Sequence, residues 1–226
     1  MTVTSDQDLP SEIILTPSRR RFLAIAHLTV LLGYVIINRL ISHMGGGATL
    51  NTVLDRYVPF WPAWVIPYLL AVIWCGVFIS WAFMAMEDTL YVAFILGWIC
   101  ACLIGYGIFL IHPIYMVRPE VTGAGWAEWL IRIIYAADRS TNVFPSQHMW
   151  DTVIITLFLS RWKPAWRRPL WGFTLIVGLS VVFIGQHWIM DVIGGTLLGV
   201  IGYYLGLAIA VRLCPPPNRR HRRSGQ

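Results

Sequence analysis

LYVAFILGWICACLIGYGIFLI, residues 90–111, decides the fold class of this chain. The stretch contains no charged side chain, and its length matches the ~20 apolar residues that a helix needs to cross a membrane. The composition agrees, since 57% of the residues are hydrophobic and only 12% are charged. Soluble domains carry about 25% charged residues. The chain is therefore predicted to be an integral membrane protein.

Five further apolar segments extend this prediction to an all-α fold, a polytopic bundle of six transmembrane helices. The six segments are residues 22–42, 64–84, 90–111, 148–162, 170–183 and 188–213. Residues 1–21 are expected to form an N-terminal segment, residues 22–213 one membrane domain, and residues 214–226 a basic tail.

Arginine clusters predict how the bundle is oriented. All 17 basic residues except Lys163 are arginine, and the net charge is +6. With six spans, the clusters at 19–21, 161–168 and 219–223 fall on one side, which the positive-inside rule assigns to the cytoplasm. Both termini are thus expected inside, and the loop 113–145 outside. Because the arginines adjoin apolar segments, they indicate topology rather than nucleic-acid binding. The scarcity of lysine beside abundant arginine suggests a bacterial source, and the expected location is the bacterial plasma membrane.

The loop 113–145 contains a pattern typical of an amphipathic helix in the outer interface. Its apolar residues at helix-like spacing are Trp126, Trp129, Leu130, Ile133, Ile134 and Tyr135. An ordinary interfacial connector and a role in substrate access are equally compatible with this pattern.

The stretch Asn142-Val-Phe-Pro145-Ser146-Gln-His148 ends this loop and opens an apolar segment. Pro145 and Ser146 indicate a helix start, where Ser146 can cap the free amides. Free amides at a helix N-terminus bind anions, because the helix dipole is positive there. His148 could then act on a bound phosphate.

His187 and Asp191 form a second candidate pair. They are four residues apart, so they are expected to share a helix face and to hydrogen-bond. A carboxylate on one imidazole nitrogen fixes the tautomer and leaves the other nitrogen free to attack. A structural pair or half of a metal site would have the same spacing. Phosphoryl transfer also needs positive charge, which Arg118 and Arg139 in the outer loop could supply.

Asp151 lies three residues after His148 and could orient it. A zinc site built from His112, His148 and His187 is an alternative, but no compact metal-ligand motif supports it.

Three motifs, Arg118-Pro119, Phe144 to His148 and His187 to Asp191, resemble in order and spacing the three signatures of the type 2 phosphatidic acid phosphatase superfamily. The resemblance covers residues 113–197. It implies an enzyme that uses no metal and no cofactor, with His187 as the phosphate-accepting nucleophile, Asp191 orienting it and His148 as the acid. Residues 22–213 would then be the catalytic domain. The candidates for holding the phosphate are Arg118, Ser146, Gln147 and Arg139, with Asn142 and Asp151 in support.

The sequence departs from the family pattern at two cation positions, which Ile111 and Val181 occupy here. Residues 135–148 look more like the inositol phosphorylceramide synthase branch, whose members transfer a phosphorylated headgroup to a lipid alcohol. The predicted function is a lipid phosphatase that acts at the outer face through a phosphohistidine. A phosphotransferase is the alternative, and a transporter or proton-relay protein is a weaker one. The expected partners are a lipid phosphate and membrane lipids, whereas the lipid's identity and the oligomeric state stay open.

Overall fold

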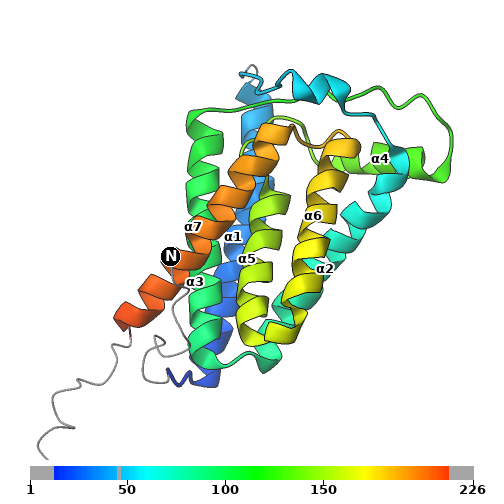
Figure 1. Cartoon of the computed structure of the whole chain (residues 1–226). Coiled ribbons are helices and arrows are strands. Elements are labelled where there is room, and N and C mark those ends of the chain that lie inside the picture. Colours follow the sequence, from blue (N-terminus) through cyan, green and yellow to red (C-terminus); the bar gives the residue numbers. More distant parts are fainter. Residues whose placement is uncertain (1–12, 45–46, 214–226) are drawn as a thin grey trace, which may run out of the picture.

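The computed structural model describes residues 13–44 and 47–213, and within these ranges the chain is all-helical with no strand. The helices are α1 (Pro17–Met44), α2 (Val65–Ala85), α3 (Asp88–Ile111), α4 (Trp126–Ala137), α5 (Gln147–Trp162), α6 (Arg167–Phe183) and α7 (Ile189–Leu213). Short 3-10 turns occupy Leu54–Tyr57, Pro62–Trp64 and Pro164–Trp166. The six long helices run side by side as a bundle, and α4 lies across one end of it (Figure 1).

Each apolar segment of the sequence forms a helix, so the predicted all-α class is confirmed. Four helices, α1, α2, α3 and α7, are long and apolar enough to cross a membrane. Helices α5 and α6 are shorter, with 16 and 17 residues. Residues 1–12 of the predicted N-terminal segment lie outside the described residues, and so does the whole tail 214–226.

Helix α1 begins at Pro17, five residues before the predicted boundary. The prediction stopped at the arginine triplet because those residues are polar, but charged side chains can continue a helix. The contacts of Arg20 explain why α1 includes the arginine triplet. Its guanidinium donates to the carbonyls of Phe83, Ala82 and Met86 at the end of α2 and pairs with Asp88 at the start of α3. One side chain therefore ties three helices together.

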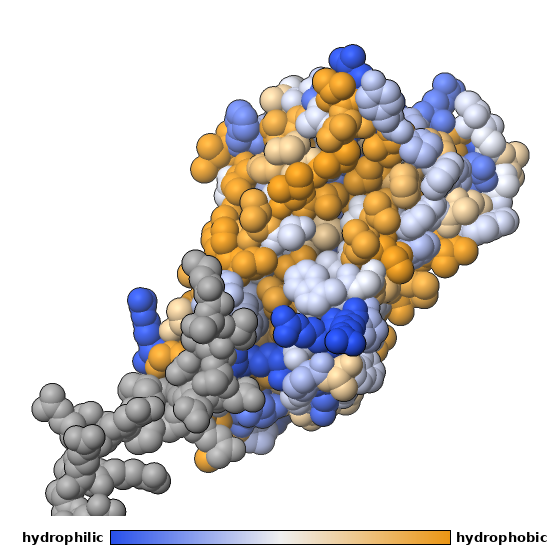
Figure 2. Space-filling model, in the orientation of Figure 1, coloured by the Kyte–Doolittle hydropathy of each residue, from blue (hydrophilic) through white to orange (hydrophobic). Residues whose placement is uncertain are grey.

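The outer surface of the bundle is apolar. Figure 2 shows hydrophobic side chains over the middle of one face and hydrophilic ones gathered toward its lower end. Large exposed hydrophobic residues include Leu32, Ile36, Ile73, Val77, Leu197 and Ile201. A surface of this kind suits lipid rather than water.

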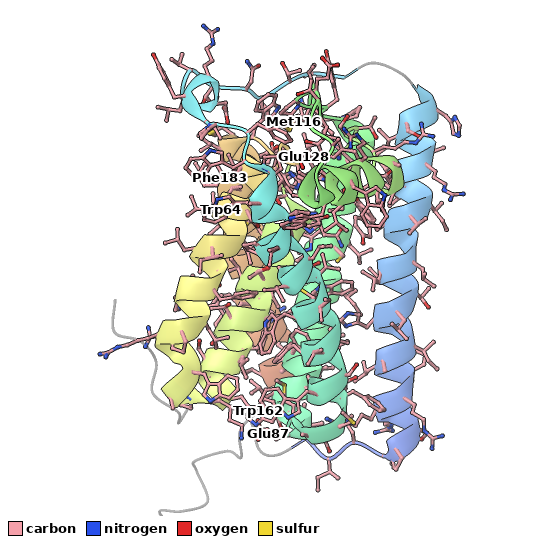
Figure 3. All side chains as sticks on the ribbon, turned by 90° about the vertical axis from the view of Figure 1, so that its right-hand side faces the viewer. Trp64, Glu87, Met116, Glu128, Trp162 and Phe183 are labelled. Atoms are coloured by element: carbon pink, nitrogen blue, oxygen red, sulfur yellow. The ribbon has the colours of Figure 1, made fainter. Side chains whose placement is uncertain are left out.

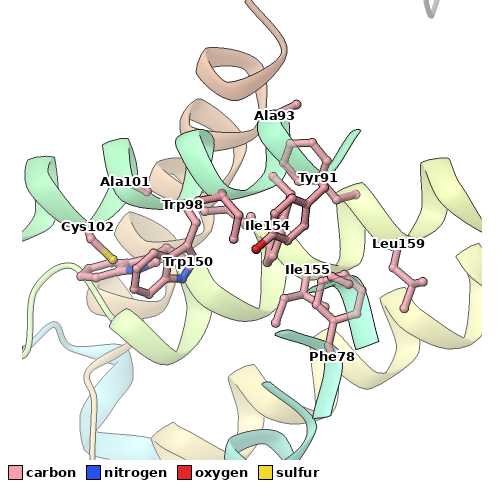
Figure 4. Close-up of a cluster of buried hydrophobic side chains, with 14 of the residues drawn as sticks. Phe78, Tyr91, Ala93, Trp98, Ala101, Cys102, Trp150, Ile154, Ile155 and Leu159 are labelled. Atoms are coloured by element: carbon pink, nitrogen blue, oxygen red, sulfur yellow. The ribbon is translucent and has the colours of Figure 1, made fainter. Parts of the chain in front are cut away.

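Helix α3 lies at the centre of the buried core. Its Phe94 and Trp98 pack with Trp150 and Phe158 of α5 in the cluster shown in Figure 4. Helix α7 approaches α3 closely, because a Cβ at Gly206 would lie 2.1 Å from the carbonyl oxygen of Ala93. Such close contact between small residues is how helices associate in membranes, where lipid removes the hydrophobic driving force between them.

The two ends of the bundle differ in structure. Glu87 and Trp162 mark the end with the short turns after α2 and α5, whereas Met116, Glu128, Phe183 and Trp64 mark the opposite end (Figure 3). The long connection between α3 and α5 and the starts of α5 and α7 are at that second end. The residues singled out in the sequence are thus brought to one end of the molecule.

Candidate active site

The starts of α5 and α7 are in direct contact. The amide of Ser146 donates to the carbonyl oxygen of Asp191 over 3.0 Å. Gly195 permits this approach, since a Cβ there would lie 2.3 Å from the carbonyl oxygen of Ser146 and 2.8 Å from Cβ of Met149. The backbone turn before α5 therefore rests on the first turns of α7.

Replacing Gly195 by alanine is expected to push Ser146 away from α7 and to lower activity about 10²-fold, because small misplacements of reacting groups are costly. Gly172→Ala is the matched control, since a Cβ at that exposed position meets nothing within 4 Å. Phosphate release and thermal unfolding of both variants check this. Equal activity of the two variants would contradict it.

His187 lies in the turn before α7 and not on the helix, so the prediction of a shared helix face was wrong. The reason is the end of α6. The amides of Gln186 and His187 both donate to the carbonyl oxygen of Val181, over 2.9 and 3.1 Å. Gly185, directly before Gln186, has φ +66°, and a Cβ there would lie 2.5 Å from Cδ of Pro119. The turn therefore requires glycine.

The imidazole of His187 is held by its Nδ1 atom. The nearest partner is the carbonyl oxygen of Val143 at 2.9 Å, and Oδ2 of Asp191 follows at 3.5 Å. A carbonyl only accepts hydrogen bonds, so Nδ1 carries the proton and Nε2 keeps its lone pair. The predicted partner of His187 is thus within ion-pair distance, but the backbone carbonyl is closer.

Asp191 is tied to the start of its own helix. Its Oδ2 accepts from the amide of Trp188 over 2.8 Å, as in a capping box, and the side chain is fully buried. Oδ1 of Asp55 accepts from the amide of Ile189 next to it. Two carboxylates therefore sit at the positive end of α7.

His148 is the second residue of α5 and stands opposite His187. The two imidazole rings are 5.5 Å apart between centroids and meet edge to face at 73°. Nε2 of His148 lies 3.4 Å from the hydroxyl of Tyr68 on α2, whose ring is also edge to face with it. A group placed between the two histidines could therefore be reached by both.

Ser146 occupies the N-cap position of α5, but its side chain makes no capping bond. The hydroxyl is buried and has no hydrogen-bond partner among the described residues. The expectation that Ser146 caps the helix was therefore wrong, because the backbone at this residue turns to meet Asp191 instead. The hydroxyl and the first amides of α5 remain available to an anion.

Arg118 is anchored at several points. One terminal nitrogen donates to the carbonyls of Tyr135 and Asp138, and the other donates to Oε1 of Gln186 over 2.7 Å. The guanidinium also stacks over the ring of Tyr135 at 4.4 Å. Burial lowers the pKa of Arg118, but arginine starts so far above neutrality that it keeps its charge. Its Nε is buried without a partner in the described structure.

Asn142 and Arg139 flank this cation. Oδ1 of Asn142 accepts from Nδ2 of Asn38 over 2.8 Å, while its own Nδ2 is buried and unpaired within the described residues. Arg139 is exposed, and its guanidinium forms no ion pair or hydrogen bond to any part of the chain that the structure describes. Both are therefore placed to donate to a ligand.

Asp151 is not bonded to His148, contrary to the predicted orienting role. Its Oδ1 accepts from Nε1 of Trp98 on α3 over 2.7 Å. The packing of α5 on α3 explains this, because it brings the indole N–H of Trp98 to the carboxylate.

One cavity of about 390 Å³ connects these groups. Seven of the nine predicted site residues line it, namely Arg118, Arg139, Asn142, Gln147, His148, Asp151 and His187. Ser146 and Asp191 are fully buried and are not part of the lining. The structure thus brings these seven residues together from α5, the turn before α7 and the loop between α3 and α5.

Tyr68 could not be identified as a site residue from the sequence, because it is one of several tyrosines in the apolar segments. Gln186 directly precedes His187 in the sequence, but only the structure links it to Arg118. No side-chain pattern could identify the backbone carbonyl of Val143 as the partner of His187.

No group of three or more His, Cys, Asp or Glu side chains within residues 13–44 and 47–213 is arranged to hold a metal ion. The zinc site considered from the sequence therefore lacks a ligand set in this part of the chain. His112 is exposed and does not line the cavity.

Comparison with known proteins gives a family match that coincides with the site. Residues 116–213 match the model of the PAP2 superfamily. The match includes every predicted site residue, from Arg118 to Asp191.

Two curated proteins are similar to parts of the chain. "Putative undecaprenyl-diphosphatase YbjG" of Escherichia coli (strain K12) is 42% identical over 74 residues, which is 30% of this chain and 33% of that protein. "Uncharacterized protein MJ0662" of Methanocaldococcus jannaschii is 27% identical over 129 residues, or 56% of this chain and 50% of that protein. The chain thus spans between a third and half of the length of these relatives.

A solved structure, the PAP2 type phosphatidylglycerolphosphate phosphatase from Bacillus subtilis, aligns over 88% of this chain and 90% of its own. The sequences are 17% identical and the TM-score is 0.35, a value too low to support a detailed structural comparison.

Proposed function

Because residues 116–213 of this membrane protein match the model of the PAP2 superfamily, we propose that it is a lipid phosphatase of that superfamily that forms a phosphohistidine on His187. The observation that carries the proposal is the hydrogen bond from Nδ1 of His187 to the carbonyl of Val143. It fixes the tautomer whose Nε2 is a nucleophile, and His148 stands opposite at 5.5 Å.

In the first step, Nε2 of His187 attacks phosphorus and the bond from phosphorus to the lipid oxygen breaks. His148, in its protonated form, gives its proton to that leaving oxygen. The phosphorylated imidazole gains positive charge, which the carboxylate of Asp191 at 3.5 Å from Nδ1 offsets. Asp191 thus acts mainly on the charge of the ring, while the Val143 carbonyl orients it.

In the second step, water attacks phosphorus and the bond to Nε2 breaks. His148, now neutral, takes the proton of the water and returns to its starting form. Inorganic phosphate leaves, and His187 regains its lone pair. The same intermediate would serve an alcohol acceptor, so hydrolysis and transfer share this chemistry.

The phosphate is held by groups that the described structure leaves with hydrogen-bonding capacity. Arg118 Nε and Ser146 Oγ are buried without partners, and the first amides of α5 point out of the helix start. At the two positions where the family has cations, Ile111 is exposed and Val181 is fully buried, so neither supplies charge. Arg139, exposed at the cavity, takes over part of this role.

We place the catalytic end of the bundle at the outer face of a bacterial plasma membrane, with α5 and α6 completing six spans. The arginines at the other end of the bundle support this orientation through the positive-inside rule. Helix α4 would lie in the outer interface, where its exposed Trp126 and Trp129 meet the headgroups.

The test of the function is a panel of lipid phosphates with purified protein in nanodiscs. It includes diacylglycerol, polyprenyl and sphingoid phosphates, and it scores free phosphate against headgroup transfer to added alcohols. Release of phosphate from at least one lipid is expected. Inertness toward the whole panel would contradict the proposal, and transfer without release would favour the phosphotransferase.

Activity is expected to persist in excess EDTA, since the attacking group is an imidazole and the charge is supplied by arginine. The measurement is the rate of phosphate release before and after chelation, with magnesium or zinc added back. Loss of activity that the metal restores would contradict the metal-independent mechanism.

A further inference from the structure

A polar group lies deeper in the cavity than the two histidines and has no part in the reaction described above. Asp151 is three residues after His148 on α5, about 4.5 Å further along the helix at 1.5 Å per residue. It is half-buried and lines the same cavity. A carboxyl group at this depth in a membrane bundle is costly and indicates a function or a needed partner.

Only one oxygen of Asp151 is satisfied within the described structure. Oδ1 accepts from Nε1 of Trp98, while Oδ2 accepts no hydrogen bond from any described residue. Trp98 is held in place by His27, whose ring is stacked on it at 3.9 Å and 9°. The indole N–H is thus fixed toward Asp151, and the other carboxyl oxygen is left for a ligand.

One more polar atom near Asp151 lacks a partner. Gln147 lines the same cavity, and its Oε1 is buried and unpaired in the part of the chain that the structure describes. An amide oxygen is a hydrogen-bond acceptor. Buried polar groups are rarely left unpaired, so this atom indicates a polar ligand group.

Much of the remaining wall of the cavity is apolar, although Asp138 and Thr152 also line it. The apolar part includes Leu31, Cys75, Ile79, Phe94 and Ile155. A lipid with its phosphate at His187 can lay its chain along this wall. Its first few carbon atoms, a short distance from the phosphorus, then pass Asp151.

We propose that Asp151, with Trp98 and Gln147, forms a subsite for a hydroxyl group of a lipid close to the reacting phosphate. A hydroxyl both donates and accepts, so it satisfies a carboxyl group in either protonation state and the amide oxygen of Gln147. An unsubstituted hydrocarbon chain can neither donate nor accept a hydrogen bond. The inference rests on the proposed function, because it needs a lipid phosphate bound at His187.

The hydroxyl can come from two sources. It can belong to the phosphorylated lipid itself, as in a monoacylglycerol phosphate or a sphingoid phosphate. It can also belong to an acceptor lipid that takes the phosphoryl group from His187 in place of water.

The first arm of the test compares a monoacylglycerol 3-phosphate with the analogue that lacks only the free hydroxyl. The wild-type protein is expected to prefer the hydroxyl lipid by about tenfold in kcat/KM, the effect of one buried hydrogen-bonded group. In Asp151→Leu this ratio is expected to fall to about one. Trp98→Phe keeps the ring stacked on His27 but removes the indole N–H, and it is expected to reduce the ratio in part.

The second arm adds a long-chain 1,2-diol to each variant and measures transfer against hydrolysis. A ratio of transfer to hydrolysis that falls in Asp151→Leu, with no preference among the phosphorylated lipids, assigns the hydroxyl to the acceptor. A preference in the first arm assigns it to the substrate. Both results support the subsite.

Ile155→Val is the matched control, since it alters the same wall one turn further along α5. Its ratios are expected to equal those of the wild type. The subsite is overturned if active Asp151→Leu or active Trp98→Phe protein keeps the wild-type ratios in both arms, or if the wild type shows no hydroxyl preference in either arm. Absence of phosphate release from every lipid would instead refute the proposed function.

Discussion

Replacing His187 by alanine is expected to lower phosphate release by about 10⁴-fold or more, the scale of loss on removing a covalent nucleophile. The reason is that the proposed bond to phosphorus forms at Nε2, and no neighbouring group can take its place in the same geometry. His148 is 5.5 Å away between ring centroids and is held by α5 and Tyr68. The rate of phosphate release from a lipid phosphate in nanodiscs is the measurement.

Two controls separate chemistry from folding. His112→Ala removes an exposed imidazole outside the cavity, at the end of α3, and should keep wild-type activity. His187→Gly leaves a space that added imidazole can fill, so partial rescue by imidazole is expected. Near-normal turnover by folded His187→Ala protein would remove the proposed mechanism.

Replacing His148 by glutamine is expected to lower release of phosphate from an alkyl lipid phosphate by about 10²–10⁴-fold, the usual contribution of a general acid. The effect should depend on the leaving group. A nitrophenyl ester leaves as a stable phenolate and needs no proton, so the loss in the first step is expected to be much smaller for it.

The burst of nitrophenol in a rapid-mixing experiment isolates that first step. Tyr68→Phe is a useful companion, because it removes the hydroxyl near Nε2 of His148 and keeps the ring. An equal loss by His148→Gln with both esters would show that His148 holds the substrate and does not protonate the leaving oxygen.

The helices could be predicted from the sequence because apolar segments long enough to span are rare outside membranes. The first and last residues of the helices could be predicted less accurately. Helix α1 begins earlier than its apolar segment because Arg20 finds backbone carbonyls on α2 and the carboxylate of Asp88. A hydropathy pattern ends a helix at a charged residue, whereas Arg20 lies within α1 and connects it to α2 and α3.

The members of the site could be predicted, but their contacts could not. Motif spacing indicated His148, His187 and Asp191, since each motif is local in the chain. The partner of His187 is a backbone carbonyl 44 residues away in the sequence. A pattern of side chains gives no information on contacts of backbone groups. Asp151 was paired with its neighbour in sequence, although the packing of α5 on α3 turned it toward Trp98.

Trapping the phosphorylated enzyme tests the central claim most directly. The protein is mixed with a lipid phosphate carrying labelled phosphorus, quenched in base within one turnover, and digested, and the label is mapped by peptide. The account predicts an acid-labile, base-stable label on the peptide that contains His187, and none in His187→Ala. A label on another residue, or turnover by direct displacement with no labelled protein at any time, would contradict it.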